Sequence, residues 1–400
     1  MFSPQLTLAL ATEDMPKHLR NEKWNKDVKV EESSYYWQSA PIITPSSHRS
    51  RITSPTVVEL FSGAGGTSVG FEMAGFTILA GADIHRPSVL TFQRNHPRAG
   101  TILGDLRKVS VDSVSGLLGS RRPDVLIAGV PCQGFSLNNR KRHDADERNQ
   151  LYKEFIRFIT VLQPRAVVLE NVSGMRSAAG GDFVRQIERE LSKATGMQIT
   201  SALLKAQDYG VPQKRSRLIF VGVAGSDPFD MREIRKTHGP DQGKPFTTVW
   251  DALSDLPSLN AGESSTSYAH PPQSEYQRLM RKGSAKVLSN HEAPNHPPET
   301  IKRIRSTRPG EPLYPRFKQR IRLDWKGLSP TQVSGGIRPQ FQFGHPDDAR
   351  GLTIRERCRL QSFPDTFIVE GGIVQGRVQT GNAVPPLLAR AIARAIKARL

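Results

Sequence analysis

The chain has 400 residues, 37% of them hydrophobic, which is enough for one large domain or two smaller ones with a sizeable core. No apolar run approaches the ~20 residues of a membrane span, no secretory signal is recognisable, and two cysteines exclude a disulfide framework and fit a reducing compartment. The formal net charge of +18 favours a polyanionic partner, so the sequence predicts an intracellular protein that binds nucleic acid.

Positive charge is concentrated in the second half of the chain. Residues 276–326 hold 13 Lys and Arg against 4 Asp and Glu, which is half of the net charge, and residues 387–400 add four cations and no acid. A solvated basic surface is the alternative explanation for such runs. Because the cluster lies in a segment of different composition from the rest, the sequence favours a nucleic-acid-binding surface.

The first 54 residues are polar and show no clear periodicity. The run Pro41-Ile42-Ile43-Thr44-Pro45-Ser46-Ser47 has the composition of a linker. We expect residues 1–54 to form a flexible N-terminal extension, and the sequence assigns it no function.

From residue 56 to residue 225, short apolar runs alternate with helical segments. The runs at 57–61, 79–82, 125–128, 166–169 and 218–221 predict buried strands, and residues 67–74 predict the helix after the first strand. Strands separated by helical segments indicate a mostly parallel sheet with helices on both faces. The sequence therefore predicts an α/β domain over residues 55–226.

That rhythm stops between residues 227 and 330, where Pro, Ser, Asn and His are frequent and much of the basic cluster lies. We expect a smaller, loop-rich region there. Regular structure resumes in residues 331–400, with helices predicted at 353–361 and 385–400. In the second helix Leu388, Ile392 and Ile396 recur every fourth position, and we expect it to pack back on the α/β domain.

A glycine-rich turn, Phe61-Ser62-Gly63-Ala64-Gly65-Gly66, follows the first predicted strand. Glycines there let the backbone turn sharply and approach a ligand closely. Asp83 ends the next predicted strand and Asp105 the one after, where a carboxylate can accept hydrogen bonds from ribose hydroxyls. Because the GxGxxG and GxxxxGK[ST] patterns are both absent, the set favours a nucleoside cofactor without phosphates, of which S-adenosylmethionine is the commonest. A turn beside two solvent-facing acids is the alternative.

Cys132 follows Pro131 shortly after the predicted strand at 125–128. The carboxyl end of a strand in an α/β fold is where active-site residues usually lie, so this thiol is a candidate nucleophile. A small residue buried at a strand end is the alternative, because unpaired cysteines are commonly buried.

Three further residues suit chemistry at the same edge of the sheet. Glu170 follows the predicted strand at 166–169, where burial would raise the pKa of its carboxyl group and suit proton transfer. Arg215 and Arg217 alternate before the last strand and would point to one face, which suits the recognition of phosphate or carboxylate. An acid that caps a helix and two arginines on a solvated edge are the alternatives.

Taken in order, these motifs resemble those of the DNA (cytosine-5) methyltransferases of bacterial restriction–modification systems. Each motif is weak or moderate alone, but the ordered series is highly specific. It extends from about residue 56 to residue 400 and leaves the first 50 or so residues outside. The series comprises the glycine-rich turn, Pro131-Cys132-Gln133, Asp146-Glu147-Arg148-Asn149-Gln150-Leu151, Glu170-Asn171-Val172, Gln213-Lys214-Arg215-Ser216-Arg217, Arg355-Glu356-Arg357, Leu360-Gln361-Ser362-Phe363-Pro364 and Gly381-Asn382-Ala383-Val384-Pro385-Pro386.

The resemblance implies a Rossmann-like, S-adenosylmethionine-dependent methyltransferase fold with a target-recognition region at 227–330. The implied reaction transfers a methyl group to C5 of a flipped-out cytosine in a specific double-stranded DNA sequence. Cys132 would attack C6 of the base, and Glu170 would hydrogen-bond and protonate N3. Arg217, together with Arg215, would hold the base and its developing charge.

The resemblance also implies where the cofactor binds. Ile84 departs from the pattern, since relatives often carry an aromatic there that stacks on adenine, and Glu59 stands where Asp is more usual. Asn382 would help to join the C-terminal helix to the cofactor end of the sheet. The implied cofactor residues are Phe61, Gly63, Gly65, Asp83, Ile84, Asp105, Leu151 and Asn382.

We therefore expect a DNA (cytosine-5-)-methyltransferase that acts as a monomer in the bacterial cytoplasm, with a cognate restriction endonuclease as a candidate partner. We expect no metal site, because His270, His291 and His296 lack cysteine partners and a metal-ligand spacing. An RNA (tRNA) cytosine-C5 methyltransferase on the same scaffold and a catalytically idle nucleic-acid-binding protein are the alternatives. A nicotinamide oxidoreductase fits the strand pattern but lacks the GxGxxG spacing.

Overall fold

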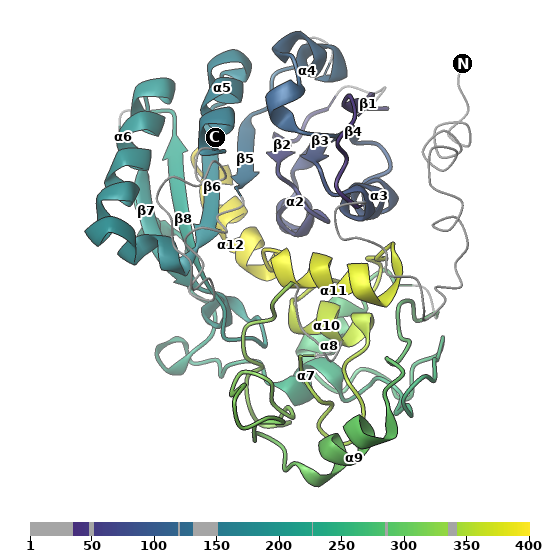
Figure 1. The fold of residues 1–400 in the computed structure, drawn as a ribbon. Coiled ribbons are helices and arrows are strands. Elements are labelled where there is room, and N and C mark those ends of the chain that lie inside the picture. The colour runs from purple at the N-terminus through teal and green to yellow at the C-terminus, as the bar shows by residue number, and fades with distance from the viewer. Residues whose placement is uncertain are drawn as a thin grey trace.

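A computed structural model gives the fold (Figure 1). It describes residues 35–47, 52–118, 121–130, 151–225, 227–284, 287–334 and 342–400. The predicted nucleophile Cys132 and the segment 131–150 around it lie outside the described residues.

Within those residues, eight strands form one mixed sheet in the order β1-β4-β3-β2-β5-β6-β8-β7. The strands from β4 to β6 are parallel, whereas β8 is antiparallel to β6 and β7, and β1 is antiparallel to β4. The expected mostly parallel α/β sheet is confirmed, with antiparallel strands at both ends. The bounds are β1 (Ile42–Thr44), β2 (Thr56–Leu60), β3 (Thr77–Asp83), β4 (Gly100–Leu103), β5 (Val125–Gly129), β6 (Ala166–Val172), β7 (Thr200–Lys205) and β8 (Ser216–Val223).

Helices cover both faces of the sheet, because successive side chains of each buried strand point to opposite sides (Figure 1). Val57 and Ile127 belong to the apolar core on one face, and Val58 and Leu126 belong to the core on the other. The first face carries α2 (Gly66–Met73), α3 (Arg86–Asn95) and α12 (Pro386–Lys397), and the second carries α4 (Val111–Leu118), α5 (Tyr152–Leu162) and α6 (Asp182–Thr195).

The five strands predicted by range are present as β2, β3, β5, β6 and β8, and the strand implied before Asp105 is present as β4, but the sequence missed β1 and β7. β1 lies inside the segment predicted to be a flexible extension, so that prediction is wrong for residues 42–44. Its pairing with β4 rests on backbone hydrogen bonds and needs no apolar alternation. β7 is an edge strand of half-buried residues, and its pattern is correspondingly weak.

A smaller region lies below the sheet in Figure 1 and contains most of the remaining helices. The predicted helices at 353–361 and 385–400 are α10 and α12. The sequence missed α11, because its residues form no apolar stripe. The bounds are α7 (Val249–Leu253), α8 (Glu275–Met280), α9 (Pro298–Ser306), α10 (Ile354–Leu360) and α11 (Gly372–Asn382).

Helix α10 is buried along its whole length, although it is rich in arginine. The Arg359 guanidinium lies 2.6 Å from Asp365 and 3.2 Å from Asp255, and Arg350 lies 2.8 Å from Glu356. Buried charges persist only when they are paired and hydrogen-bonded. Part of the chain's positive charge therefore stabilises the smaller region from inside and is not exposed to a polyanion.

The C-terminal helix α12 returns to the sheet and packs on α2 through glycine. A Cβ atom added to Gly70 would come within 2.4 Å of the Ala389 Cβ and 2.5 Å of the Pro386 carbonyl oxygen. One turn earlier, a Cβ on Gly66 would come within 2.4 Å of the Val384 carbonyl oxygen. The two glycines let α2 lie directly against the backbone of the return segment.

This contact predicts that Gly70→Ala destabilises the protein by about 1–3 kcal/mol, because a methyl group there must displace backbone of α12. Gly116→Ala in α4 is the matched control, since no other part of the described structure comes within 4 Å of the added Cβ. The control should be neutral or stabilising by roughly 0.5–1 kcal/mol, because alanine favours a helix interior. Thermal and urea unfolding of both variants measure the difference; equal stability of the two would contradict the close packing.

Candidate functional site

The glycine-rich turn follows β2 at the carboxyl edge of the sheet and has an unusual backbone. Phe61, Gly63 and Gly65 have φ values of +53°, +52° and +92°, and a side chain such as Phe61 adopts such a value only under constraint. The constraint is visible in the hydrogen bonds: the Ser62 N–H donates to the Ala82 carbonyl oxygen at 2.9 Å. Strand β3 therefore holds the turn in place.

Asp83, the last residue of β3, organises the same edge. Its carboxylate accepts hydrogen bonds from the Gly63 N–H at 2.8 Å and from the His85 N–H at 2.7 Å. Burial raises the pKa of Asp83, and these hydrogen bonds oppose that rise. Among the described residues, no atom beyond the chain neighbours lies within 4 Å of a Cβ built on Gly63, so this part of the structure leaves space beside the turn and the carboxylate. A turn with an adjacent buried acid and free volume fits the ribose of a nucleoside cofactor.

The other predicted cofactor residues lie around this edge in different states. Ile84 is half-buried directly after Asp83. Asp105 caps the turn after β4, and Arg107 pairs with its carboxylate at 2.7 Å and lowers its pKa. Leu151 stands half-buried before α5, and Asn382 is the exposed last residue of α11. The Asp105 carboxylate is therefore in an ion pair with Arg107, which the sequence did not predict.

Gly129, the last residue of β5, lies between the turn and Glu170. A Cβ built on Gly129 would lie 3.4 Å from the Phe61 carbonyl oxygen and 3.6 Å from the Glu170 Oε2. The sequence analysis gave this glycine no role. Strand β5, which leads to Cys132, therefore lies between β2, which leads to the glycine turn, and β6, which carries Glu170.

Glu170 and Arg217 form an ion pair inside the sheet, with 2.6 Å between Oε1 and Nε. The register pairs Glu170 with Ile219 and Val172 with Arg217, so the two side chains are diagonal neighbours on one face. The sequence predicted that Glu170 follows the strand, but Glu170 lies within β6. The pair depends on β8 running antiparallel beside β6.

Burial is the main influence on the Glu170 carboxyl group, whose side chain is 13% exposed. Burial raises the pKa of Glu170, and the charges of Arg217 and Arg215 limit the rise. The carboxyl group therefore holds a proton more tightly than a solvated glutamate does, which suits a proton donor.

Arg215 is close to this pair but makes other contacts. Its two terminal nitrogens donate to the Gln332 carbonyl oxygen at 3.0 Å and to the Gly381 carbonyl oxygen at 2.8 Å. The side chain is 1% exposed. Arg215 thus ties the sheet edge to the return segment.

Glu59 has a structural position in the interior of β2. Its carboxylate accepts hydrogen bonds from the Ser68 N–H at 3.0 Å and the Ser68 hydroxyl at 2.5 Å, near the start of α2. Burial raises the pKa of Glu59 to about 7, against these hydrogen bonds. This acid therefore anchors α2 behind the glycine turn.

Two of the three histidines considered for a metal site, His291 and His296, are buried and hydrogen-bonded within the protein. His291 contacts the Thr353 hydroxyl at 3.0 Å and the Pro257 carbonyl oxygen at 3.1 Å, and His296 accepts the Gly351 N–H at 2.9 Å. In the part of the chain that the structure describes, no cluster of three or more His, Cys, Asp or Glu is arranged to hold a metal ion. Likewise, none of the described helices has the length and hydrophobicity to cross a membrane.

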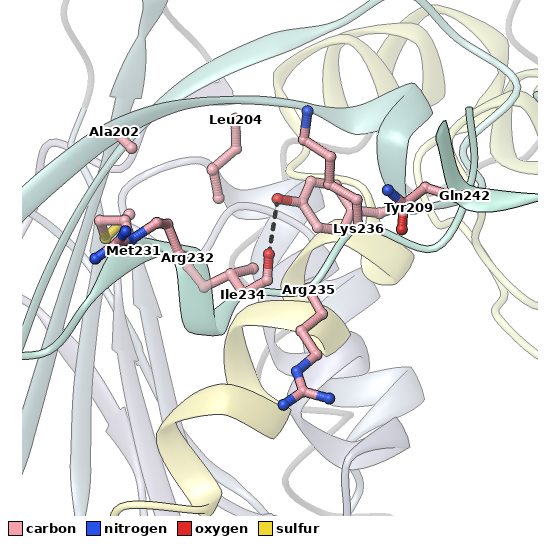
Figure 2. Close-up of a pocket in the computed structure, with 9 residues that line it drawn as sticks. All are labelled: Ala202, Leu204, Tyr209, Met231, Arg232, Ile234, Arg235, Lys236 and Gln242. Carbon is pink, nitrogen blue, oxygen red and sulfur yellow. Dashed lines mark hydrogen bonds between the residues drawn. The ribbon is translucent and has the colours of Figure 1, made fainter. Parts of the chain in front are cut away.

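A pocket of about 490 Å³ lies away from this site, at the β7 edge of the sheet (Figure 2). Lys236 on its rim pairs with Asp208 at 3.0 Å, and Arg232 pairs with Asp230 at 2.5 Å. Because β5, β6 and β8 separate β7 from β2, this pocket is distinct from the glycine turn. Its lining is Ala202, Leu204, Tyr209, Met231, Arg232, Ile234, Arg235, Lys236 and Gln242.

Residues 35–38 also reach the predicted cofactor edge, which the sequence did not predict. The Trp37 N–H donates to the Ile84 carbonyl oxygen at 2.9 Å, and Tyr36 forms a β-bridge with His85. The available signal was the aromatic run Tyr35-Tyr36-Trp37 in an otherwise polar segment.

Comparison with known protein families gives one match over most of the chain. The family model described as C-5 cytosine-specific DNA methylase matches residues 55–398. That range begins at β2 and ends in α12, so it includes both the sheet and the smaller region.

Curated relatives cover nearly the whole chain. The Type II methyltransferase M1.HphI of Haemophilus parahaemolyticus is 34% identical over 381 residues, covering 94% of this chain and 96% of that protein. The Type II methyltransferase M.DdeI of Desulfomicrobium norvegicum is 33% identical, covering 85% of this chain and 88% of that protein.

Solved structures share the fold. A protein described as a DNA modification methyltransferase encoded within an Escherichia coli prophage superposes with a TM-score of 0.72 at 29% identity, covering 86% of this chain and 99% of that chain. The Dnmt2 methyltransferase of S. pombe superposes with a TM-score of 0.56 at 14% identity, covering 86% and 98%, and shows the fold alone.

The pKa of Glu59 predicts a pH-dependent stability. A folded-state pKa of about 7 lies above the ordinary value of 4.5, so the folded state holds the proton more tightly than the unfolded state. Stability from this group is complete below pH 4.5 and is lost as the pH rises to about 7, by on the order of 3 kcal/mol. Glu59→Gln should remove this loss, so the wild type should become less stable relative to the variant between pH 5 and pH 8. Unfolding curves for both proteins at matched pH measure it; parallel pH profiles would show that Glu59 titrates normally.

Proposed function

The chain belongs to the C-5 cytosine-specific DNA methylase family and is a DNA (cytosine-5-)-methyltransferase, and on this basis we propose which form of DNA it acts on, which cofactor it uses and how the reaction proceeds. We propose that it transfers a methyl group from S-adenosylmethionine to C5 of a flipped-out cytosine in a specific double-stranded DNA sequence. The reaction passes through a covalent bond between Cys132 and C6 of the base.

The observation that carries this proposal is the buried Glu170–Arg217 pair beside Gly129. Gly129 is paired with Glu170 across the sheet, and Cys132 follows Gly129 by three residues in the sequence. On the other side of Gly129 lies the Phe61 carbonyl of the glycine turn. The glycine turn and the acid therefore lie on the two strands that flank β5, next to the point where the chain continues to Cys132.

The chemistry requires both a nucleophile and an acid. Cytosine C5 is too poor a nucleophile to accept a methyl group unaided. The Cys132 thiolate adds to C6 while Glu170 donates a proton to N3, which makes C5 enamine-like and able to attack the methyl group. A base then removes the C5 proton and the C6–S bond breaks, so that the Cys132 thiolate leaves. N3 returns its proton to Glu170, which restores the aromatic ring and regenerates the acid.

The two arginines have different roles in this proposal. Arg217 contacts Glu170 directly, keeps its carboxyl group oriented and holds the base. Arg215 is a positioning residue, because its guanidinium nitrogens are already bonded to two carbonyl oxygens of the return segment. Its charge still reaches Glu170 and limits the rise of that pKa.

The cofactor residues fit S-adenosylmethionine, which supplies an electrophilic methyl group when bound. Asp83 accepts the ribose hydroxyls, and the turn of Phe61, Gly63 and Gly65 leaves space for the nucleoside. The wall around it is completed by Ile84, Asp105, Leu151 and Asn382.

The DNA partner is supported by charge. The basic cluster at 276–326 falls within the proposed target-recognition region, residues 227–330, where phosphate contacts give affinity and base-edge contacts give sequence choice. Flipping the base out of the duplex costs a few kcal/mol, which these contacts offset. We also propose that the enzyme is cytoplasmic and monomeric. The names of its Type II methyltransferase relatives support a place in a bacterial restriction–modification system.

The direct test is methyl transfer from labelled S-adenosylmethionine to mixed-sequence duplex DNA, read by base-resolution cytosine sequencing. The wild type should methylate cytosine within one short recurrent sequence, and Cys132→Ala should abolish the reaction because no other group can add to C6. Cys358→Ala is the matched control, since it removes the chain's other cysteine from a buried place in α10.

Each outcome discriminates between mechanisms and substrates. Loss of methylation in Cys358→Ala but not in Cys132→Ala would refute the assigned nucleophile. Transfer to tRNA without transfer to duplex DNA would instead establish an RNA methyltransferase. A folded wild type that binds DNA and transfers no methyl group would establish a binding protein.

A further inference from the structure

The N-terminal segment makes an extended contact with the sheet that the family match does not include. We name residues 35–44 the N-terminal strap. Its last part is β1, where Ile42 pairs with Leu103 of β4. Just before β1, Pro41 lies so close to Gly104 that a Cβ on that glycine would come within 2.9 Å of the Pro41 Cα. The strap therefore leaves the edge of the sheet at the carboxyl end of β4.

From there the strap crosses the ends of two strands. The Gln38 carbonyl oxygen accepts a hydrogen bond from the Lys108 Nζ at 3.1 Å, beyond the turn that Asp105 caps. One residue earlier, the Trp37 N–H donates to the Ile84 carbonyl oxygen at 2.9 Å. The strap thus spans both strand ends that carry the acids of the cofactor site.

The register of this crossing places Trp37 beside Ile84. The antiparallel bridge between Tyr36 and His85 makes Trp37 and Ile84 the next opposite pair. Opposite residues of two paired strands present their side chains on the same face, within ordinary contact distance. A ligand that touches Ile84 from that face also touches Trp37.

The Trp37 indole is held in place from two sides. Its Nε1–H donates to the Ala40 carbonyl oxygen at 2.8 Å, and the Arg86 guanidinium lies 5.4 Å from the ring centroid. The side chain is half-buried, so part of the ring surface remains accessible. A fixed aromatic surface next to a nucleoside site is preorganised for stacking on a base.

We propose that the N-terminal strap closes the adenine side of the cofactor site and that Trp37 packs against the purine ring. This inference rests on the proposed use of S-adenosylmethionine. It assigns a ligand-binding role to a segment that lies before the family match, which begins at residue 55.

The similarity to the relative from Haemophilus parahaemolyticus extends over the strap. Its alignment covers 94% of the 400-residue chain, so about 24 residues lie outside it. Even if all of those belong to the N-terminus, the alignment includes the whole strap. The strap therefore lies within the part of the chain that is 34% identical to that protein, although it lies before the family match.

The first test measures the affinity for S-adenosylhomocysteine, the demethylated cofactor, by calorimetry with the full-length protein and no DNA. Trp37→Ala should weaken binding by roughly 5- to 100-fold, which is the range of base–aromatic stacking. Trp37→Phe should keep the affinity within a few-fold, since a phenyl ring still stacks. Trp250→Ala is the matched control, because that tryptophan is 41% exposed in α7 and should bind as the wild type does.

A second measurement keeps the proposal testable even if Trp37→Ala does not fold. S-adenosylhomocysteine should quench part of the wild-type tryptophan fluorescence, and Trp37→Phe should lose that quenching while it still binds. Unchanged quenching in Trp37→Phe, or unchanged affinity in a folded Trp37→Ala, would overturn the role of the strap and leave the proposed function intact. No binding of S-adenosylhomocysteine by the wild type would instead overturn the cofactor assignment itself.

Discussion

The buried ion pair between Glu170 and Arg217 is the constraint on which the rest of the site depends. A carboxylate removed from water is costly unless an opposite charge and hydrogen bonds compensate it. Here the compensation comes from β8, whose antiparallel register puts Arg217 diagonally opposite Glu170. The topology at this end of the sheet is thus inseparable from the chemistry proposed for the acid, since a parallel strand in the same place would present a different register.

The same constraint connects the site to the end of the chain. Arg215 stands on the same side as Arg217, and its guanidinium is bonded to carbonyl oxygens of Gln332 and Gly381. The return segment continues into α12, which lies against α2 through Gly66 and Gly70. Contacts between residues more than 300 positions apart therefore fix α2, the helix that follows the glycine turn. Glu59 of β2 fixes the same helix through its hydrogen bonds to Ser68. The cofactor edge and the acid edge are fixed by one connected set of contacts.

Much of the sheet could be predicted from the sequence because its strands are buried on both faces and appear as apolar runs. The residue types of the site could also be predicted, since Asp83, Glu170 and Arg217 stand at or near the ends of such runs. Their pairing could not, because it depends on the register of β8 against β6. Asp105 has a cationic partner that only the structure identifies. The N-terminal strap was missed for a related reason: a three-residue strand bonded through its backbone leaves no periodic signal, and only the aromatic run at 35–37 marked it.

The proposed covalent mechanism is tested most directly by trapping the adduct on duplex DNA that carries 5-fluorocytosine at the target site. Fluorine at C5 cannot be removed as a proton is, so after methyl transfer the bond between Cys132 and C6 persists and survives denaturation. With S-adenosylmethionine present, the wild type should accumulate this complex, and Glu170→Gln should form it about 10²- to 10⁴-fold more slowly, because the amide cannot protonate N3. Adduct formation by Glu170→Gln at the wild-type rate would contradict the role of the buried pair.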